Sequence, residues 1–221
     1  MAIKLYGSLT SCVTMVMCVL KEKGLEYERI NIDFSTGEHK SPEYMEKQPF
    51  GQVPCLDDDG FLVYECRAIC HYLAAKYANQ GTPNLIPPAD DFKAIARFHQ
   101  AVSVETHNFN KYVWMVTRER VIKPLYFKQE WNQDIIDQAF KEIDDKLAVY
   151  DKILAKQKYM AGDTFTLADL FHLSFGTTVI RCGCKSFEKY PNVSRWWNDI
   201  SSRKAWQEVY EESKHYYDPI F

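Results

Sequence analysis

The N-terminal part of the chain alternates between strand-like and helix-like spacings of apolar residues. Residues 3–6 alternate between apolar and polar positions and end at Gly7, which predicts a short strand. In residues 12–23 the apolar positions recur three and four residues apart, which predicts a helix, and Gly24 ends it. Residues 27–32 alternate again as a strand. This order predicts a βαβ unit whose two strands pair in parallel.

The pattern that follows predicts a hairpin and a second helix. Two short apolar runs, residues 55–56 and 61–64, flank an acidic turn that ends in glycine, as in a β-hairpin. Residues 65–77 place their apolar side chains on one helical face. The polar stretch between the two strand pairs predicts no regular element. Residues 1–78 therefore predict the order βαβ, irregular segment, ββα.

Beyond residue 78 the pattern is helical after one interruption. Residues 79–91 contain three prolines and no amphipathic period, so they predict a linker. The helical segments that follow span residues 92–120, 132–156, 167–181, 193–202 and 206–214. We therefore expect two domains: residues 1–78 form an α/β domain and residues 92–221 an all-α domain.

Composition and charge narrow the possible functions. Apolar residues make up 46% of the chain and charged residues 26%, as in an ordinary globular protein. The chain has 27 basic and 30 acidic residues and no basic run longer than two, so we expect no nucleic-acid partner. No stretch approaches the length of an apolar membrane span, and the N-terminus carries no apolar targeting segment. We therefore expect no membrane partner and a cytoplasmic location.

Cysteines and histidines give no metal-binding pattern. The seven cysteines are odd in number and scattered, which favours free thiols in a reducing compartment. The six histidines lack the HExxH spacing, and Cys182 and Cys184 have no second pair at zinc spacing, so we predict no metal site. The phosphate-binding loops GxxxxGK[ST] and GxGxxG are also missing.

The Val53-Pro54 pair precedes the predicted hairpin and is a candidate binding element. An X-Pro bond can be cis at modest cost, and a cis bond here would turn the backbone N–H and C=O of Val53 outward. Such groups can pair with an extended peptide ligand, as in strand addition. A plain tight turn is the alternative interpretation.

The start of the helix at Glu65-Cys66-Arg67 is a second candidate. It offers a carboxylate for an ammonium group and free backbone N–H groups for a carboxylate, the two ends of an amino-acid head group. The alternative is a Glu that only complements the helix dipole. His39 and Lys40 could meet a second carboxylate, or could be solvated loop residues. Together the three segments predict a site for a short peptide.

These segments resemble the glutathione transferase superfamily, and its phi class in particular. The resemblance rests on residues 37–44 (GEHKSPEY), 48–54 (QPFGQVP) and 64–69 (YECRAI), and on residues 159–169 (YMAGDTFTLAD) of the helical part. In the last segment Thr166 and Asp169 stand at the N-cap and N3 positions of a capping box with Asp in place of Glu. The motifs extend along the whole chain in order.

The resemblance implies a thioredoxin-like N-terminal domain, an all-helical C-terminal domain and a homodimer in which Phe50 contacts the partner subunit. It also implies a glutathione site, in which Val53 pairs with the cysteinyl backbone and Glu65 holds the γ-glutamyl head. The residues that match the family's glutathione-binding positions are His39, Lys40, Gln52, Val53, Pro54, Glu65 and Cys66.

The sequence departs from the phi pattern in two places. Cys66 stands where the family has Ser, and a thiol is a weaker hydrogen-bond donor than a hydroxyl. The catalytic turn is one residue short, so Thr10 matches the catalytic Ser when counted back from the end of the first helix. Ser11 matches it when counted from Gly7. A turn absorbs a deletion more easily than a helix, which favours Thr10.

The activity implied is conjugation of glutathione to small hydrophobic electrophiles, with a hydroxyl group stabilising the thiolate. Candidate residues of an electrophile pocket between the domains are Leu9, Phe34, Phe109, Val113 and Trp114. One alternative is a thiol transferase that uses Cys12, in the first turn of a helix where the dipole lowers a thiol pKa. Another is a non-catalytic ligand-binding or scaffold protein of the same fold.

Overall fold

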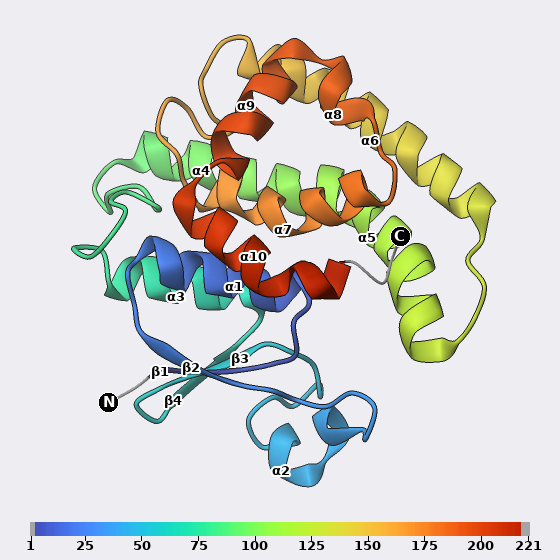
Figure 1. Cartoon of the computed structure of the whole chain (residues 1–221). Coiled ribbons are helices and arrows are strands. Elements are labelled where there is room, and N and C mark those ends of the chain that lie inside the picture. The colour runs from blue at the N-terminus through green and yellow to red at the C-terminus, as the bar shows by residue number, and fades with distance from the viewer. Residues whose placement is uncertain (1–2, 218–221) are drawn as a thin grey trace.

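The computed structural model describes residues 3–217, and its N-terminal part is a four-stranded mixed sheet (Figure 1). The strands β1 (Ile3–Tyr6), β2 (Tyr27–Ile30), β3 (Cys55–Asp58) and β4 (Phe61–Tyr64) lie in the order β2-β1-β3-β4. The β1–β2 pair is parallel, and β1–β3 and β3–β4 are antiparallel. The predicted βαβ unit and hairpin are confirmed.

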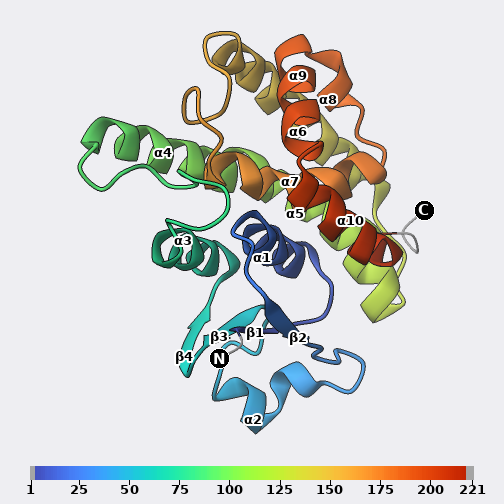
Figure 2. The ribbon, with the colours of Figure 1, turned by 60° about the vertical axis from the view of Figure 1, so that its left-hand side comes forward.

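Two helices cover one face of this sheet and separate it from the helical domain. The helices α1 (Ser11–Glu22) and α3 (Cys66–Lys76) lie side by side between the sheet and the helical domain in both ribbon views (Figures 1 and 2). Nearly all of α1 is buried, because it packs on the sheet with one face and on the helical domain with the other.

The segment predicted to be irregular contains two short helices on the opposite side of the sheet. These are η1 (Glu38–Lys40) and α2 (Pro42–Met45) (Figure 2). Ser41 caps α2 by accepting a hydrogen bond from the backbone of Tyr44, and Pro42 occupies the first helical position. Helices this short have no amphipathic period, so the hydrophobic pattern could not indicate them.

The remainder of the described chain is helical, as the fold prediction required. Its elements are α4 (Phe92–Glu105), η2 (Thr106–Asn110), α5 (Lys111–Thr117), η3 (Arg118–Phe127), α6 (Gln133–Leu154), α7 (Leu167–Arg181), α8 (Ser186–Lys189), α9 (Pro191–Ser201) and α10 (Lys204–Tyr217). The single helix predicted over residues 92–120 is wrong in detail: the run continues to Phe127, and the segments η2 and η3 are π-helical.

Helix α7 lies at the centre of the helical domain and is buried along almost its whole length. Its start confirms the predicted capping box, in which Thr166 and Asp169 each bond the other's backbone. The buried Asp169 also accepts hydrogen bonds from the backbone of Met160, at 2.8 Å, and from Nε1 of Trp196, at 2.9 Å. These bonds satisfy an otherwise isolated buried carboxylate.

Polar contacts join the two parts of the molecule along α1 and α3. Arg67 of α3 forms a two-bond ion pair with Glu105 of α4, at 2.7 and 2.9 Å. Glu22 at the end of α1 pairs with Arg203, at 2.6 Å. The first pair thus joins α3 to the helical domain, and the second joins it to α1, the helix that follows the candidate catalytic turn.

Within residues 3–217, no helix is long and apolar enough to cross a membrane.

Candidate functional site

The turn that follows β1 places Thr10 at the N-cap of α1. Its backbone is extended, and Oγ1 accepts a long hydrogen bond from the backbone N–H of Val13, at 3.4 Å. The side chain is half-buried, and its hydroxyl hydrogen has no acceptor among the described residues. Thr10 can therefore donate a hydrogen bond to a ligand beside the positive end of the helix.

Ser11, the other candidate for the activating hydroxyl, faces the helical domain instead. The side chain is buried, and Oγ lies 3.1 Å from Oγ1 of Thr178 in α7. The backbone oxygen of Ser11 accepts a hydrogen bond from Ser174, at 2.6 Å. Ser11 thus connects α1 to α7, a role that sequence spacing alone could not indicate.

Cys12 does not have the low pKa predicted from its position in the first helical turn. The Cys12 thiol donates a hydrogen bond to the sulfur of Cys66. That bond, together with burial and the charge of Glu65, raises the pKa of the Cys12 thiol. The raised pKa disfavours the thiolate, so the structure gives no support to Cys12 as the nucleophile of a thiol transferase.

Glu65 directly precedes α3 with a backbone conformation that non-glycine residues rarely adopt, at φ 70° and ψ 110°. Such strained residues cluster at ligand-binding positions. The side chain is exposed and does not cap its own helix. Within the described residues no hydrogen bond or ion pair occupies the carboxylate, which leaves it available for a cationic ligand.

The predicted binding loop before β3 has a cis peptide bond between Val53 and Pro54. It lies close to the candidate catalytic turn, since a Cβ added to Gly7 would come within 3.3 Å of Cβ of Val53. Both backbone polar groups of Gln52 are hydrogen-bonded to side chains. Its N–H donates to Gln48 Oε1, at 3.2 Å, and its oxygen accepts from Tyr44 Oη, at 2.7 Å.

The residues His39 and Lys40 pack against the same loop through Gly51. Gly51 has φ 57°, and a Cβ there would lie 2.5 Å from the backbone oxygen of His39. Lys40 donates to the backbone oxygen of Phe50, at 2.8 Å, so one of its three protons is already used. Nδ1 of His39 is buried and has no hydrogen-bond partner within the described chain. Such an orphaned donor or acceptor suits a polar ligand.

The three predicted segments therefore converge on the start of α1. Gly7 brings the loop of Val53 against the candidate catalytic turn, and the interaction of the Cys12 and Cys66 thiols relates that turn to the start of α3. Gly51 attaches the segment of His39 to the loop of Val53. The site thus combines a hydroxyl donor at a helix N-terminus, open backbone groups and a free carboxylate.

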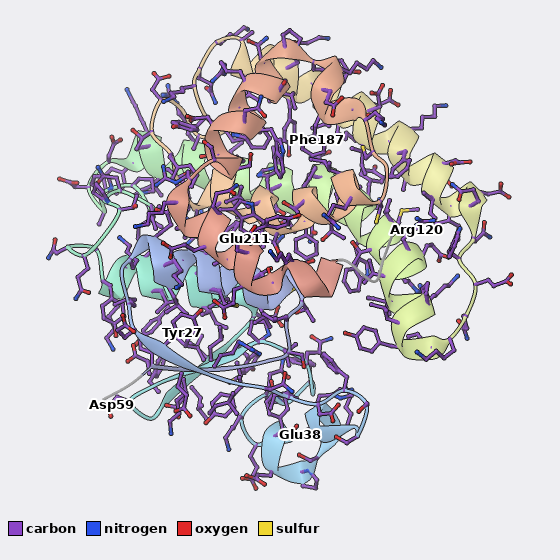
Figure 3. The ribbon with its side chains drawn as sticks, viewed as in Figure 1. Tyr27, Glu38, Asp59, Arg120, Phe187 and Glu211 are labelled. Atoms are coloured by element: carbon purple, nitrogen blue, oxygen red, sulfur yellow. The ribbon has the colours of Figure 1, made fainter. Side chains whose placement is uncertain are left out.

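The candidate electrophile-binding residues divide into two groups. Phe109 and Val113 are fully buried, which is contrary to the prediction that they line a pocket. Phe109 contacts His172, at 4.8 Å between ring centroids, and Phe187, at 6.1 Å. Phe187 belongs to α8, and its side chain is buried inside the helical domain (Figure 3). Apolar side chains at helical spacing here belong to the core.

Leu9, Phe34 and Trp114 remain at or near the surface. Leu9 and Phe34 are half-buried, and the Trp114 side chain is 47% exposed. Phe34 contacts Tyr126 of η3 edge-on, at 5.6 Å between ring centroids, so an aromatic pair joins the two domains. Sequence reasoning missed Tyr126, because it lies beyond the predicted end of its helix. Arg120 lies in η3 as well (Figure 3), and its guanidinium group stacks on the ring of Trp131.

Comparisons with known proteins bear on this arrangement. Family models match the chain over residues 1–75 (glutathione S-transferase, N-terminal domain) and 114–204 (glutathione S-transferase, C-terminal domain). The glutathione S-transferase hmp2 of Hypomyces subiculosus is 45% identical over 97% of this chain and 100% of its own length. The crystal structure of glutathione transferase F7 from Populus trichocarpa has a TM-score of 0.89 at 33% identity, covering 96% of this chain and 99% of that one.

Glutathione S-transferase I from maize, solved in complex with an atrazine glutathione conjugate, also has a TM-score of 0.89. It is 32% identical and covers 97% of this chain and 99% of its own.

Proposed function

Since this chain belongs to the glutathione S-transferase family and is a glutathione transferase, we propose that it conjugates glutathione to hydrophobic electrophiles with the Thr10 hydroxyl as thiolate stabiliser. Within the family it resembles the phi class, as its motifs indicate. The observation that carries the proposal is the difference between the two hydroxyl groups: that of Thr10 has no acceptor among residues 3–217, whereas that of Ser11 bonds Thr178.

The chemical requirement is a glutathione thiolate near neutral pH. A free cysteine thiol has a pKa of about 8.5, so few molecules are ionised at pH 7. A hydrogen bond from the Thr10 hydroxyl would favour the charged sulfur, and the N-terminus of α1 adds its positive dipole. Each unit by which the pKa falls corresponds to about 1.4 kcal/mol, within reach of one charge-assisted bond.

Glutathione would be bound by the segments that converge on α1. The Glu65 carboxylate, exposed and uncommitted, supports a role in holding the γ-glutamyl ammonium group. The backbone N–H groups at the start of α3 suit the neighbouring carboxylate. Val53 would pair with the cysteinyl backbone, and the orphaned Nδ1 of His39 would meet the glycyl end. Cys66 would offer its backbone N–H to the γ-glutamyl carboxylate, together with a thiol that is a weaker hydrogen-bond donor than the hydroxyl of Ser.

The Glu65→Gln variant is expected to bind glutathione about 1 to 3 kcal/mol more weakly, because the amide loses the charge that pairs with the ammonium. Isothermal titration calorimetry at pH 7 measures this. Glu43→Gln, an exposed carboxylate on α2, is the matched control and should bind as the natural protein does. Equal affinity of the natural protein and Glu65→Gln would contradict the assignment.

The electrophile would lie against apolar side chains of both domains. Leu9, Phe34 and Trp114 support this, with Tyr126 added from its contact with Phe34. The maize relative was solved in complex with an atrazine glutathione conjugate, which supports conjugation of an organic substrate here. Initial rates with glutathione and a chromogenic aromatic electrophile test the proposal directly, and a rate no faster than the uncatalysed reaction would overturn it.

A homodimer is proposed on the support of Phe50. This side chain lies in the loop before β3, is 62% exposed and has an edge contact to Tyr64, at 6.1 Å between ring centroids. A large aromatic that its own domain leaves exposed suits a pocket of a partner subunit. A cytoplasmic location is proposed on the support of seven unpaired cysteines, which suit a reducing compartment.

Replacing Phe50 by Ala is expected to weaken dimerisation by about 2 kcal/mol or more, the usual cost of truncating an aromatic anchor. Sedimentation equilibrium across a concentration series measures the shift. Phe127→Ala removes an aromatic side chain of similar exposure, 63%, from η3 and should leave the association unchanged. A natural protein that sediments as a monomer at micromolar concentration would rule the dimer out.

A further inference from the structure

Four cysteines lie along the contact between α1 and α3. The two helices start at the same end and run side by side above the sheet (Figure 2). Sγ of Cys70 in α3 lies 4.0 Å from the backbone oxygen of Met15 in α1. Cys70 therefore lies beside Met15 where the two helices pack. One helical turn toward the start of each helix, the same alignment places Cys66 opposite Cys12.

The thiols of Cys12 and Cys66 are hydrogen-bond partners at the start of both helices. Cys12 is half-buried, so a small molecule can reach this end of the contact. Cys66 is 7% exposed, and its Sγ lies 4.0 Å from Nη1 of Arg67. The pair therefore combines two neighbouring thiols at the start of adjacent helices, partial access to solvent at Cys12 and a guanidinium group beside the sulfur of Cys66.

The two sulfurs differ in their readiness to ionise. The hydrogen bond from Cys12 lowers the pKa of the Cys66 thiol, and the charge of Arg67 acts in the same direction. Burial and the carboxylates of Glu105 and Glu65 oppose this without reversing it. The same hydrogen bond raises the pKa of Cys12. One thiol is thus prepared as the nucleophile, and the other holds its proton beside it.

The remaining cysteines of the contact lack these features. Cys18 and Cys70 are fully buried, and burial is the main cause that raises the pKa of each thiol well above its usual value. An ionised sulfur at either position would lie in an apolar interior without access to solvent. Reactivity is therefore confined to the end of the contact where α1 and α3 begin.

We propose that Cys12 and Cys66 form a redox-active dithiol that a hydroperoxide converts to an intramolecular disulfide. The Cys66 thiolate attacks one oxygen of the hydroperoxide, the O–O bond breaks, and the alcohol or water leaves with a proton, giving a sulfenic acid. The Cys12 sulfur then attacks the Cys66 sulfur, the S–O bond breaks, and water leaves with the Cys12 proton. Two thiols are oxidised, and one hydroperoxide is reduced to alcohol or water.

The disulfide would also change the glutathione site, a consequence that rests on the proposed function. A disulfide requires the two sulfurs to approach to about 2.05 Å, which draws Cys66 toward α1. The thiol could then no longer donate to the γ-glutamyl carboxylate. We expect the oxidised protein to bind glutathione about fivefold more weakly, the fold-change for one lost hydrogen bond.

Thiol counting on the full chain tests the disulfide without any reference to conjugation. The reduced protein is treated with a small excess of hydrogen peroxide, denatured and titrated with a chromogenic thiol reagent. The count should fall from seven to five, and peptide mass spectrometry should find residues 12 and 66 in one linked pair. Dithiothreitol should restore seven. Absence of this linked pair, or a different pair in its place, would overturn the proposal.

Three variants complete the experiment. Cys12→Ser and Cys66→Ser should each abolish the linked pair, and Cys12→Ser should retain a sulfenic acid at Cys66 that a dicarbonyl reagent traps. Cys70→Ser, one turn further along α3, should still form the link and is the matched control. If Cys70→Ser blocks the link while Cys12→Ser does not, the assignment of the pair is wrong.

Calorimetry of the reduced and oxidised proteins separates the two proposals. Weaker binding after oxidation supports the coupling, and equal binding overturns it. If the reduced protein does not bind glutathione at all, the proposed function fails, whereas the thiol count still decides the disulfide.

Discussion

Thr10→Val is expected to lower glutathione conjugation at pH 7 by about tenfold to a hundredfold. Valine keeps the shape of threonine but cannot donate a hydrogen bond, so the pKa of bound glutathione should rise by about one to two units. Below that pKa the thiolate fraction falls tenfold for each unit by which the pKa rises. The deficit should therefore disappear as the pH is raised above the new pKa. A pH profile of kcat with a chromogenic electrophile measures both effects.

One control variant isolates the hydroxyl of Thr10. Thr10→Ser keeps the donor and the N-cap, and should retain most of the activity. Thr10→Val also loses the bond from Val13, at a cost of about 1 kcal/mol of stability, so the assays need a temperature at which both variants are folded.

Ser11→Ala should lose about 1 kcal/mol of stability through its broken bond to Thr178 while keeping the pH profile of the natural protein. If Ser11→Ala shifts the profile and Thr10→Val does not, the activating residue is Ser11. If neither does and Cys12→Ser abolishes exchange with glutathione disulfides, a cysteine mechanism takes the place of the hydroxyl mechanism.

Arg67→Met is expected to lower the free energy of unfolding at pH 7 by about 3 to 5 kcal/mol. The change removes the guanidinium partner of Glu105, whose side chain is 0% exposed, and leaves a buried carboxylate unpaired. Urea unfolding followed by circular dichroism measures the loss. The double variant Arg67→Met with Glu105→Met should recover most of it, because an apolar pair of similar size needs no compensating charge. A double variant as unstable as Arg67→Met would contradict this account.

The Arg67–Glu105 pair also predicts how the free energy of unfolding changes with pH. Burial raises the pKa of Glu105, and Arg67 partly offsets the effect. In Arg67→Met that offset is lost, so the folded state binds the proton more tightly than the unfolded state does. The Glu105 contribution to stability is then fully present below its unfolded pKa, about 4.3, and is lost as the pH rises. The deficit of Arg67→Met should therefore be largest at neutral pH and shrink toward pH 4.

The sequence by itself determined the elements whose signals are local. The alternation of residues 3–6 and 27–32, the acidic turn before β4 and the capping box of α7 each lie within a few residues of chain. Backbone sterics and hydrogen bonding act at that range, so the pattern predicts strands, hairpin and helix starts from neighbours alone. The motifs at residues 37–44, 48–54 and 64–69 indicated the family because each is a contiguous run of residue identities that can be compared without knowledge of the fold.

Only the tertiary structure decided which side chains are available for chemistry. The sequence left Thr10 and Ser11 as competitors, and Thr178, a distant residue of α7, distinguishes them by bonding Ser11. It could not tell that Phe109 is a core residue and that Tyr126 reaches Phe34, because helical spacing does not say which helix packs against a face. The sequence also could not show which of the seven scattered cysteines are neighbours in the fold. The register of α1 against α3, set by packing of distant segments, brings Cys12 and Cys66 together.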